Sequence, residues 1–254
     1  MGQMGSQVME RHGLQGAAPG LAHAHPLHWR PRPPTQPLYA MPASAWLAEP
    51  ALRGWRAAVK RVEDIVVALA ALALLGPLML LIALWIRLDS PGPALFRQRR
   101  TGLGGREFQM LKFRTMHQEA AEQAGCRQAT RCDPRITRAG ILLRRASIDE
   151  LPQLLNVLRG EMSVVGPRPH APGTRAGGRP FETVVPFYPA RHRVRPGMTG
   201  LAQIRGWRGE TDTEEKLIRR VQSDLEYIAC WSLWLDLRLL ARTLGATLSM
   251  KNAY

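Results

Sequence analysis

The longest apolar run in the chain extends over 22 residues, from Ile65 to Ile86, without a charged side chain. As an α-helix it would be roughly 33 Å long, about the hydrocarbon thickness of a bilayer. The pair Gly76 and Pro77 interrupts the run near its middle. The pattern therefore predicts a membrane-embedded helix over residues 59–89 that bends at this pair.

Basic side chains flank this run at both ends. Lys60 and Arg61 precede it, and Arg87 and Arg97 follow it. The positive-inside rule places both ends on the cytoplasmic side, which a straight span cannot satisfy. Proline removes a backbone donor and clashes with the preceding turn, so a helix broken at Pro77 can enter one leaflet and return. We predict a re-entrant helical hairpin, and a single kinked transmembrane helix is the open alternative.

Residues 90–254 carry shorter patterns that are typical of a folded domain. Ala94–Gln98 and Phe108–Phe113 flank a glycine-rich turn and predict a β-hairpin. A helical run opens at Ser147, and Thr211 and Glu214 have the spacing of a capping box that opens another helix. One face of that second helix is apolar; it comprises Leu217, Ile218, Val221, Leu225 and Ile228. The chain therefore predicts a mostly helical α+β fold.

The segment Trp231–Leu237 is apolar nearly all round but too short to span a bilayer. Its two tryptophans suit the headgroup layer, so we expect it to lie on the membrane surface, with burial in the protein core as the alternative. The predicted architecture is a re-entrant membrane helix hairpin joined to a small cytosolic domain. That domain has interfacial amphipathic helices and a short β-hairpin.

The first 50 residues differ in composition from the rest, with eight of the 20 prolines and four of the seven histidines. They show no apolar periodicity, and we predict a disordered arm over residues 1–58. The full chain has 35 Lys and Arg against 20 Asp and Glu, a net charge of +15 that suits an anionic partner such as phospholipid, nucleotide or nucleic acid. Its three cysteines cannot form a disulfide framework, which favours a reduced, cytosolic setting.

One pair of adjacent carboxylates stands out as candidate chemistry. Asp149 and Glu150 have Arg138, Arg144 and Arg145 nearby in the sequence. Oxygen ligands for a hard cation and guanidinium groups for phosphates are what a magnesium-dependent reaction on a diphosphate needs. The alternative is structural, because Ser147 and Glu150 also have capping-box spacing.

Two stiff loops add further arginines. Arg168 lies between prolines in residues 166–169, and Arg195 opens the Pro-Gly-containing loop of residues 195–200. Proline fixes the chain, so each arginine can grip a phosphate at little ordering cost. Either loop alone is a turn with a surface arginine, whereas together with the carboxylate pair they indicate a phosphate site facing lipid.

Five ordered phrases carry a family resemblance: KFRTM at residues 112–116, DPRIT at 133–137, SIDELPQLL at 147–155, MSVVGPRP at 162–169 and VRPGMTG at 194–200. They resemble the monotopic polyprenyl-phosphate phosphoglycosyl transferases, the bacterial sugar transferase family. The C-terminal phrases GWRGETDTEEK, WSLWLDL and NAY are most similar to undecaprenyl-phosphate glucose phosphotransferases of exopolysaccharide synthesis. The resemblance extends from about residue 60 to residue 254 and makes residues 90–254 a catalytic domain.

The resemblance implies a two-step transfer. Asp149 would attack the β-phosphate of a UDP-sugar, release UMP and carry the phosphosugar until undecaprenyl phosphate accepts it. Asp149 and Glu150 would hold Mg²⁺. Arg144 and Arg168 would contact phosphate, and the further candidates for substrate binding are Lys112, Arg195, Arg208 and Asp224.

The sequence departs from the family pattern in three places. First, Gly76 precedes the hairpin proline where many relatives have Ser. Second, the Gly- and Pro-rich stretch 171–190 replaces a more polar helical segment. Third, the Pro-rich arm stands where larger relatives have further membrane helices and a soluble domain. The first departure removes a hydroxyl that would satisfy a freed carbonyl at the bend. The second departure leaves the identity of the transferred hexose open, with glucose favoured.

The implied setting is the cytoplasmic face of a bacterial inner membrane, with membrane lipid, a UDP-sugar and undecaprenyl phosphate as partners. The resemblance leaves room for a homo-oligomer and implies no nucleic acid. A rival interpretation of the charge is a basic membrane-surface or nucleic-acid binding protein without catalysis. Aromatic residues are only 6% of the chain and no base-reading motif occurs, which argues against nucleic acid. An inactive relative that acts as an assembly scaffold is a third interpretation.

Overall fold

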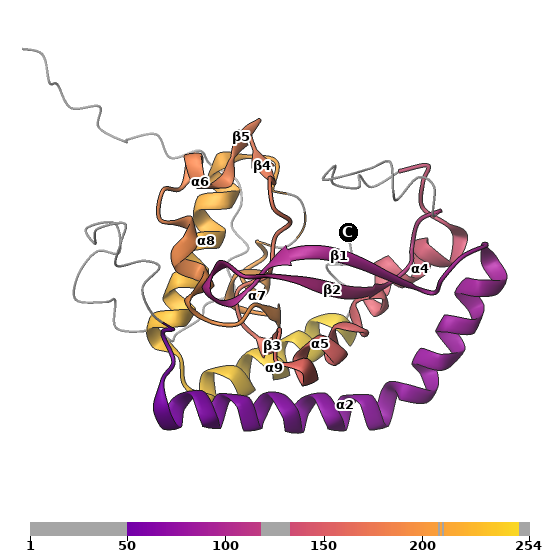
Figure 1. Ribbon diagram of the computed structural model, residues 1–254, viewed down its shortest axis with the longest axis horizontal. Helices are drawn as coiled ribbons and strands as arrows, with labels where there is room; N and C mark the ends of the chain where they lie inside the picture. The colour runs from indigo at the N-terminus through magenta and orange to yellow at the C-terminus, as the bar shows by residue number, and fades with distance from the viewer. Residues whose placement is uncertain (1–49, 118–132, 208, 210, 249–254) are drawn as a thin grey trace, which may run out of the picture. The chain divides into compact units, whose positions relative to one another are not determined.

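The computed structural model describes residues 50–117, 133–207, 209 and 211–248 (Figure 1). These all belong to one compact unit that covers residues 32–254, and a second unit, residues 1–31, lies outside the described part. The predicted arm therefore lies largely outside the described residues. The elements, in chain order, are α2 (Gly54–Asp89), β1 (Leu95–Thr101), η2 (Leu103–Gly105), β2 (Glu107–Phe113), α4 (Arg138–Ala146), η3 (Ile148–Glu150), α5 (Gln153–Arg159), β3 (Ser163–Val165), β4 (Arg175–Ala176), β5 (Arg179–Pro180), α6 (Phe181–Val184), η4 (Tyr188–Arg193), β6 (Gly197–Thr199), α7 (Leu201–Ile204), α8 (Glu214–Cys230) and α9 (Leu233–Leu248).

The apolar run forms a single 36-residue helix, α2, with Pro77 inside it. It begins at Gly54, before the predicted residue 59, and ends at the predicted Asp89. In Figure 1, α2 runs along the lower edge and then turns upward toward its C-terminal end. Helix continues through Pro77 on both sides, so the structure shows a bent helix and does not show the expected break into a hairpin. A Cβ at Gly76 would meet no atom within 4 Å, so sterics do not require glycine there.

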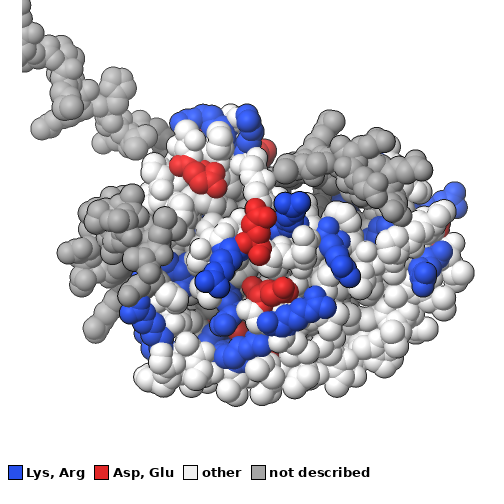
Figure 2. Space-filling view, in the orientation of Figure 1, with Lys and Arg blue, Asp and Glu red and all other residues white. Residues whose placement is uncertain are grey.

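Within the described residues, α2 is the one helix long and apolar enough to cross a membrane. Only 11% of its most apolar window is buried inside the protein, which distinguishes it from the core helix of a soluble domain. Figure 2 shows the same contrast, because the lower right of the view, where α2 lies in Figure 1, is white, whereas charged side chains gather over the middle. The exposed apolar surface of α2 is what a lipid environment would cover.

The N-terminal part of α2 is tied to the rest of the fold by buried charges. Lys60 Nζ lies 3.0 Å from Asp64 and 2.8 Å from Asp236 of α9, and all three side chains are buried. Asp64 also accepts hydrogen bonds from the Ser163 hydroxyl at 2.8 Å and from the Val164 N–H at 2.9 Å. Lys60 is therefore part of a buried ion cluster rather than a basic flank that faces lipid headgroups. The cluster joins α2 to β3 and α9.

Arginine side chains satisfy the carbonyls at two helix ends. Arg114, which is buried, donates to the carbonyls of Ile86, Ser90 and Pro91 where α2 ends. Arg61 of α2 donates to the carbonyls of residues 157 and 158 at the end of α5, at 2.6 and 2.8 Å. The last carbonyls of a helix have no partner within the helix, so these guanidinium groups supply the missing donors.

The β-hairpin is confirmed. Strands β1 and β2 pair antiparallel from Leu95 opposite Phe113 to Thr101 opposite Glu107, and Gly104 and Gly105 take positive φ in the turn. The hairpin packs on α5 through Asn156, whose side chain accepts from the backbone of residue 111 and donates to the carbonyl of residue 109. These contacts place the end of β2 close to the turn that precedes α5.

The two proline-containing loops lie directly against each other. Strand β3 precedes the first loop and pairs in parallel with β6 in the second loop. A Cβ at Gly197 would lie 2.1 Å from the Gly166 nitrogen, and one at Gly200 would lie 2.3 Å from the Gly166 oxygen. The glycines are required by this close approach of two backbones.

Helix α8 confirms the predicted apolar face except at Ile218, which is exposed, and does not confirm the predicted cap. Thr213, not Thr211, is the N-cap residue, and its hydroxyl accepts from the Lys216 N–H at 3.3 Å. Leu217, Val221 and Leu225 pack in one core cluster with Phe181, Val185 and Tyr188. Thr213, two positions after Thr211, is the residue whose side chain reaches a free N–H group of the helix. The capping-box spacing alone therefore placed the N-cap two residues too early.

Helix α9 is longer than the predicted apolar segment 231–237. Trp231 is buried, and its indole N–H donates to Asp236 at 2.9 Å, so it is a core residue. Trp234 is 67% exposed and agrees with the expected surface position. The expected surface position is therefore confirmed for Trp234 and wrong for Trp231.

Arg114→Ala should destabilise the fold, because it leaves the α2 carbonyls without donors. We expect a loss of about 2 kcal/mol, or roughly 4–8 °C in Tm, measured by thermal unfolding in detergent. Arg106→Ala, at an exposed position in the hairpin turn, should change Tm by less than about 2 °C. Equal shifts in the two variants would contradict the capping role.

Candidate active site

The carboxylate pair lies in a tight turn between two helices. Helix α4 ends at Ser147, which takes the left-handed conformation with φ 58°, and η3 then carries Asp149 and Glu150. Ser147 makes no side-chain capping bond at the start of η3, so the capping-box alternative for Ser147 and Glu150 is wrong. Because the two carboxylates lie in a 3₁₀ turn rather than mid-helix, they project from a compact corner of the chain.

Glu150 is held by two cations. Arg168 forms a two-armed contact, with Nη1 at 2.9 Å from Oε2 and Nη2 on Oε1, and Lys112 Nζ lies 3.1 Å from Oε1. Burial alone would raise the pKa of Glu150, but the charges of Arg168 and Lys112 outweigh it and hold that pKa well below its usual range. Glu150 is therefore a fixed anion whose two oxygens are both engaged.

Asp149 has the opposite electrostatic setting. Its side chain is only 8% exposed, and none of the described residues donates a hydrogen bond to it. Burial raises the pKa of Asp149, Lys112 opposes that rise, and the charge of Glu150 adds to it. Two adjacent carboxylates thus have pKa values displaced in opposite directions, an arrangement found where two acids serve different roles.

Arg144 approaches the pair from the last turn of α4. Its Nε donates to the Thr115 hydroxyl at 2.8 Å, and its charge lowers the pKa of Asp149. Thr137 caps the start of α4, accepting from the Gly140 N–H at 2.9 Å. A Cβ at Gly140 would lie 2.1 Å from the Thr115 oxygen, so α4 packs directly on the segment that follows β2. The KFRTM and DPRIT phrases form the two sides of one contact, because Met116 and Ile136 form an isolated antiparallel bridge and the Thr137 N–H donates to the Thr115 carbonyl at 3.1 Å.

The structure brings together five of the predicted site residues. They are Lys112, Arg144, Asp149, Glu150 and Arg168, and they come from β2, α4, η3 and the first proline-containing loop. Three positive charges thus surround two carboxylates in a buried corner. This arrangement can hold an anionic phosphate beside a carboxylate oxygen.

Two other predicted substrate-binding residues, Arg195 and Asp224, lie outside this group. Arg195 donates from Nε to the Gly160 carbonyl at 2.8 Å, a structural role beside the end of α5. Asp224 is buried and receives hydrogen bonds from Arg191 at 3.0 and 2.6 Å. Arg208 lies outside the described residues. Gly76 and Pro77 belong to α2.

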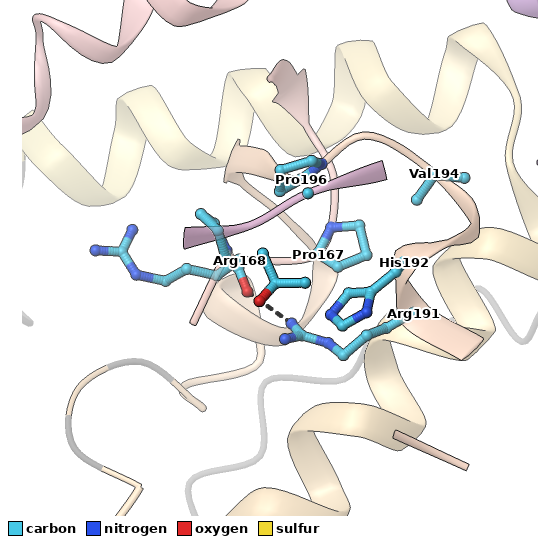
Figure 3. A pocket seen from close by; sticks show the side chains of 9 residues that line it. Pro167, Arg168, Arg191, His192, Val194 and Pro196 are labelled. Carbon is cyan, nitrogen blue, oxygen red and sulfur yellow. Dashed lines mark hydrogen bonds between the residues drawn. The ribbon is translucent and has the colours of Figure 1, made fainter. Parts of the chain in front are cut away.

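The sequence did not indicate Arg191, which binds the backbone of the loop that carries Arg168. Its Nη2 donates to the Arg168 carbonyl at 2.7 Å, and Nε and Nη2 both donate to Asp224. Figure 3 shows the guanidinium group of Arg191 near the backbone of Arg168, whose own side chain extends away from it. The small cleft drawn there is lined by Thr101, Gly102, Pro167, Arg168, Pro169, Arg191, His192, Val194 and Pro196. No spacing in the sequence indicates this contact, because Arg191 and Asp224 are 33 positions apart.

Comparison with known proteins gives a direct family match. The family described as bacterial sugar transferase matches residues 55–250. The chain belongs to the bacterial sugar transferase family. This bacterial sugar transferase has its carboxylate turn, its hairpin and all of α2 except Gly54 inside the matched residues.

Individual relatives agree with this membership. A UDP-glucose:undecaprenyl-phosphate glucose-1-phosphate transferase of Caulobacter vibrioides is 55% identical over 197 residues, which cover 77% of this chain and 72% of the relative. An undecaprenyl-phosphate glucose phosphotransferase of Komagataeibacter xylinus is 51% identical over 80% of this chain and 38% of the relative. An exopolysaccharide production protein PSS of Rhizobium leguminosarum is 51% identical over 77% of this chain and 98% of the relative. The similar region thus ranges from less than half to nearly all of a relative.

The two carboxylates should affect stability with opposite signs. The folded state raises the pKa of Asp149, so its ionised carboxylate destabilises the protein at neutral pH. This cost disappears below the unfolded pKa of about 3.9. Asp149→Asn should therefore raise Tm at pH 7. Glu150 has a depressed folded pKa and stabilises the protein above its unfolded pKa of about 4.3, so Glu150→Gln should lower Tm at pH 7.

Thermal unfolding of both variants and the parent protein between pH 4 and pH 8 measures this difference. The gain from Asp149→Asn should shrink as the pH falls towards 4. The loss from Glu150→Gln should persist to lower pH, because the Glu150 contribution disappears only as the pH falls through its depressed folded pKa. Shifts of the same sign at pH 7 would contradict the assignment.

Proposed function

We propose that the protein transfers glucose-1-phosphate from UDP-glucose to undecaprenyl phosphate, releases UMP and so initiates synthesis of an exopolysaccharide. The observation that carries this proposal is Asp149, a buried carboxylate beside three cationic side chains in the residues that match the family. The names of the Caulobacter and Komagataeibacter relatives supply the donor, the acceptor and the sugar.

Asp149 is the proposed nucleophile. Its carboxylate oxygen attacks the sugar-bearing phosphorus of the donor, a new P–O bond forms, the bond from that phosphorus to the bridging oxygen breaks, and UMP leaves with the electron pair. Lys112, Arg144 and Arg168 lie where they can offset the charge of the approaching diphosphate. Burial that raises the pKa of Asp149 also leaves it poorly solvated, which favours a nucleophile once it is ionised.

The acceptor completes the cycle at the same carboxyl group. An oxygen of undecaprenyl phosphate attacks the phosphorus held on Asp149, and the carboxylate is released as the leaving group. The product is a lipid diphosphate sugar. A covalent intermediate lets a water-soluble donor and a lipid acceptor react in turn at one site. Glu150, clamped by Arg168 and Lys112, does not compete as a nucleophile because both its oxygens are engaged.

The carboxylate pair fits Mg²⁺ in the chemistry of its donors. Mg²⁺ commonly takes one or two carboxylates together with phosphate oxygens and water. Among the described residues no group of three metal-binding side chains occurs, so the protein itself offers only the oxygens of Asp149 and Glu150. Bound there, the metal would offset negative charge on the diphosphate.

A membrane location follows from the acceptor and from the exposed apolar surfaces. We propose that α2 is re-entrant, so that both its ends lie on the cytoplasmic face of the bacterial inner membrane. Its bend at the Pro77 region, the exposed Ile141 and Leu142 of α4 and the exposed Trp234 of α9 support this proposal. These helices are suited to rest in the interface around the embedded α2.

The rival based on net charge loses much of its support. Arg61, Arg114, Arg191 and Arg195 are engaged by backbone carbonyls or a buried carboxylate. Side chains that stabilise the fold cannot also neutralise phosphates of a nucleic acid. The net charge therefore overstates the cationic surface that is available to a polyanion.

Asp149→Asn should lower UMP release by at least about a thousandfold, because the amide cannot act as the nucleophile. Membranes containing the protein are supplied with UDP-glucose, undecaprenyl phosphate and Mg²⁺, and UMP is quantified. Asp212→Asn, at an exposed site, should retain parental activity. Omission of the lipid phosphate should limit UMP to a single turnover, and addition of EDTA should suppress it. Substantial activity in Asp149→Asn would refute the nucleophile assignment.

The intermediate should be visible as a mass adduct on the protein. Incubation with UDP-glucose in the absence of lipid phosphate should add one hexose phosphate to the peptide that contains Asp149, detected by intact-protein and peptide mass spectrometry. The adduct should disappear on addition of undecaprenyl phosphate and should be absent from Asp149→Asn. An adduct on another residue, or none in a protein that turns over, would contradict the covalent route.

A further inference from the structure

A buried histidine that the proposed mechanism does not use lies at the centre of two arginines. The Nδ1 atom of His170 lies 2.6 Å from Nη1 of Arg191 and 2.7 Å from the Tyr188 hydroxyl. On the opposite edge of the ring, Nε2 lies 2.9 Å from Nη1 of Arg220. The ring also meets Phe181 edge-on, at 5.1 Å between centroids. His170 thus lies between two guanidinium groups, with one at each edge of its ring.

The ring must be uncharged to fill this position. Burial, and then the charges of Arg191 and Arg220, hold the pKa of His170 well below its usual range. A neutral imidazole has one donor and one acceptor nitrogen, so only one of the two guanidinium groups can donate to it. With the proton on Nδ1, Nε2 accepts from Arg220 and Nδ1 donates to the Tyr188 oxygen, which also accepts from Nη1 of Arg191 at 3.0 Å. A protonated ring would place a third positive charge beside two others and would remove the acceptor for Arg220.

Each arginine holds a different loop. Arg191 donates to the carbonyl of Arg168, the residue that grips Glu150. Arg220 donates through Nε to the Trp207 carbonyl and through Nη2 to the Gly209 carbonyl, both at 3.0 Å. Trp207 and Gly209 lie in a segment that follows α7 and precedes α8. The imidazole and the Tyr188 hydroxyl together therefore connect the two carbonyl-binding arginines.

We propose that His170 is a positioning residue whose imidazole, together with the Tyr188 hydroxyl, joins Arg191 to Arg220 and so holds the Arg168 loop and the carbonyls of Trp207 and Gly209 in one fixed arrangement. In its effect on catalysis this inference rests on the proposed function, because a fixed Arg168 keeps Glu150 clamped beside Asp149. His170 itself touches neither carboxylate in these contacts. It acts through Arg191 and Arg168.

His170→Phe tests the bridge with little loss of packing. Phenylalanine keeps an aromatic ring against Phe181 and removes both nitrogens. Arg191 would retain Asp224, and Arg220 would retain two carbonyls, so the fold should survive. Hydrogen exchange measured by mass spectrometry on the full chain in nanodiscs should increase in peptides covering residues 166–170 and in peptides covering residues 206–209. The matched control is His192→Phe, which alters another ring packed on Tyr188 and should leave exchange in both loops unchanged.

Two conservative variants separate the two edges of the ring. An asparagine amide occupies the position of Nδ1 and a glutamine amide that of Nε2. His170→Asn should therefore protect residues 166–170 more than His170→Phe does, and His170→Gln should do so for residues 206–209. UMP release by His170→Phe should fall by about tenfold to a hundredfold in kcat, with less than about a threefold change in KM for UDP-glucose, and each amide should restore part of it.

The inference fails if His170→Phe leaves exchange unchanged in either loop, or if it loosens both loops and leaves kcat at the parental value. A variant that unfolds is replaced in the comparison by His170→Gln, whose exchange in residues 166–170 should still exceed that of the parent protein. Failure of the proposed function appears separately, as absence of UMP release from the parent protein. The exchange measurements would then still decide whether His170 couples the two loops.

Discussion

The clamp on Glu150 is the interaction on which the candidate site depends. Two carboxylates in adjacent positions of a buried turn repel each other and are both poorly solvated, which is costly unless cations compensate. Arg168 and Lys112 compensate one of them directly, and the second keeps a raised pKa. The clamp also unites segments distant in the chain, because it joins the end of β2, η3 and the loop after β3. The fold thereby displaces the pKa values of two chemically similar carboxylates in opposite directions.

Arginine serves two purposes in this protein. At the candidate site its planar group faces carboxylates and is suited to phosphates. Elsewhere the same group replaces missing backbone donors, as Arg114 does at the end of α2 and Arg61 does at the end of α5. A basic chain therefore need not have an equally basic surface.

The sequence predicted those features whose partners are near in the chain. The end of α2, the β-hairpin and the apolar face of α8 follow from local patterns, and the structure has all three. The pairing of Lys60 with Asp236 and of Arg191 with Asp224 was missed, because each joins residues far apart that no spacing rule connects. Lys60 was interpreted as a membrane flank for that reason, and Asp224 as a substrate contact.

The candidate site was predictable for a different reason. Short ordered phrases placed Asp149, Glu150 and Arg168 in one family pattern, although only the fold shows that Arg168 contacts Glu150. The same reasoning included Arg195, which instead binds a backbone carbonyl. A phrase marks a residue as part of a shared structure, and the geometry then decides between a structural role and a chemical one.

The interlocked glycines of the two proline-containing loops restrict how this scaffold can diversify. Since Gly166, Gly197 and Gly200 leave no space for even a methyl group between the backbones, neither loop can be exchanged for one of another shape while its neighbour stays in place. Variation between homologues, whether natural or engineered, must therefore be accommodated in segments outside this interlock. The stretch of residues 171–190 is one such segment, with its short β4–β5 ladder and α6.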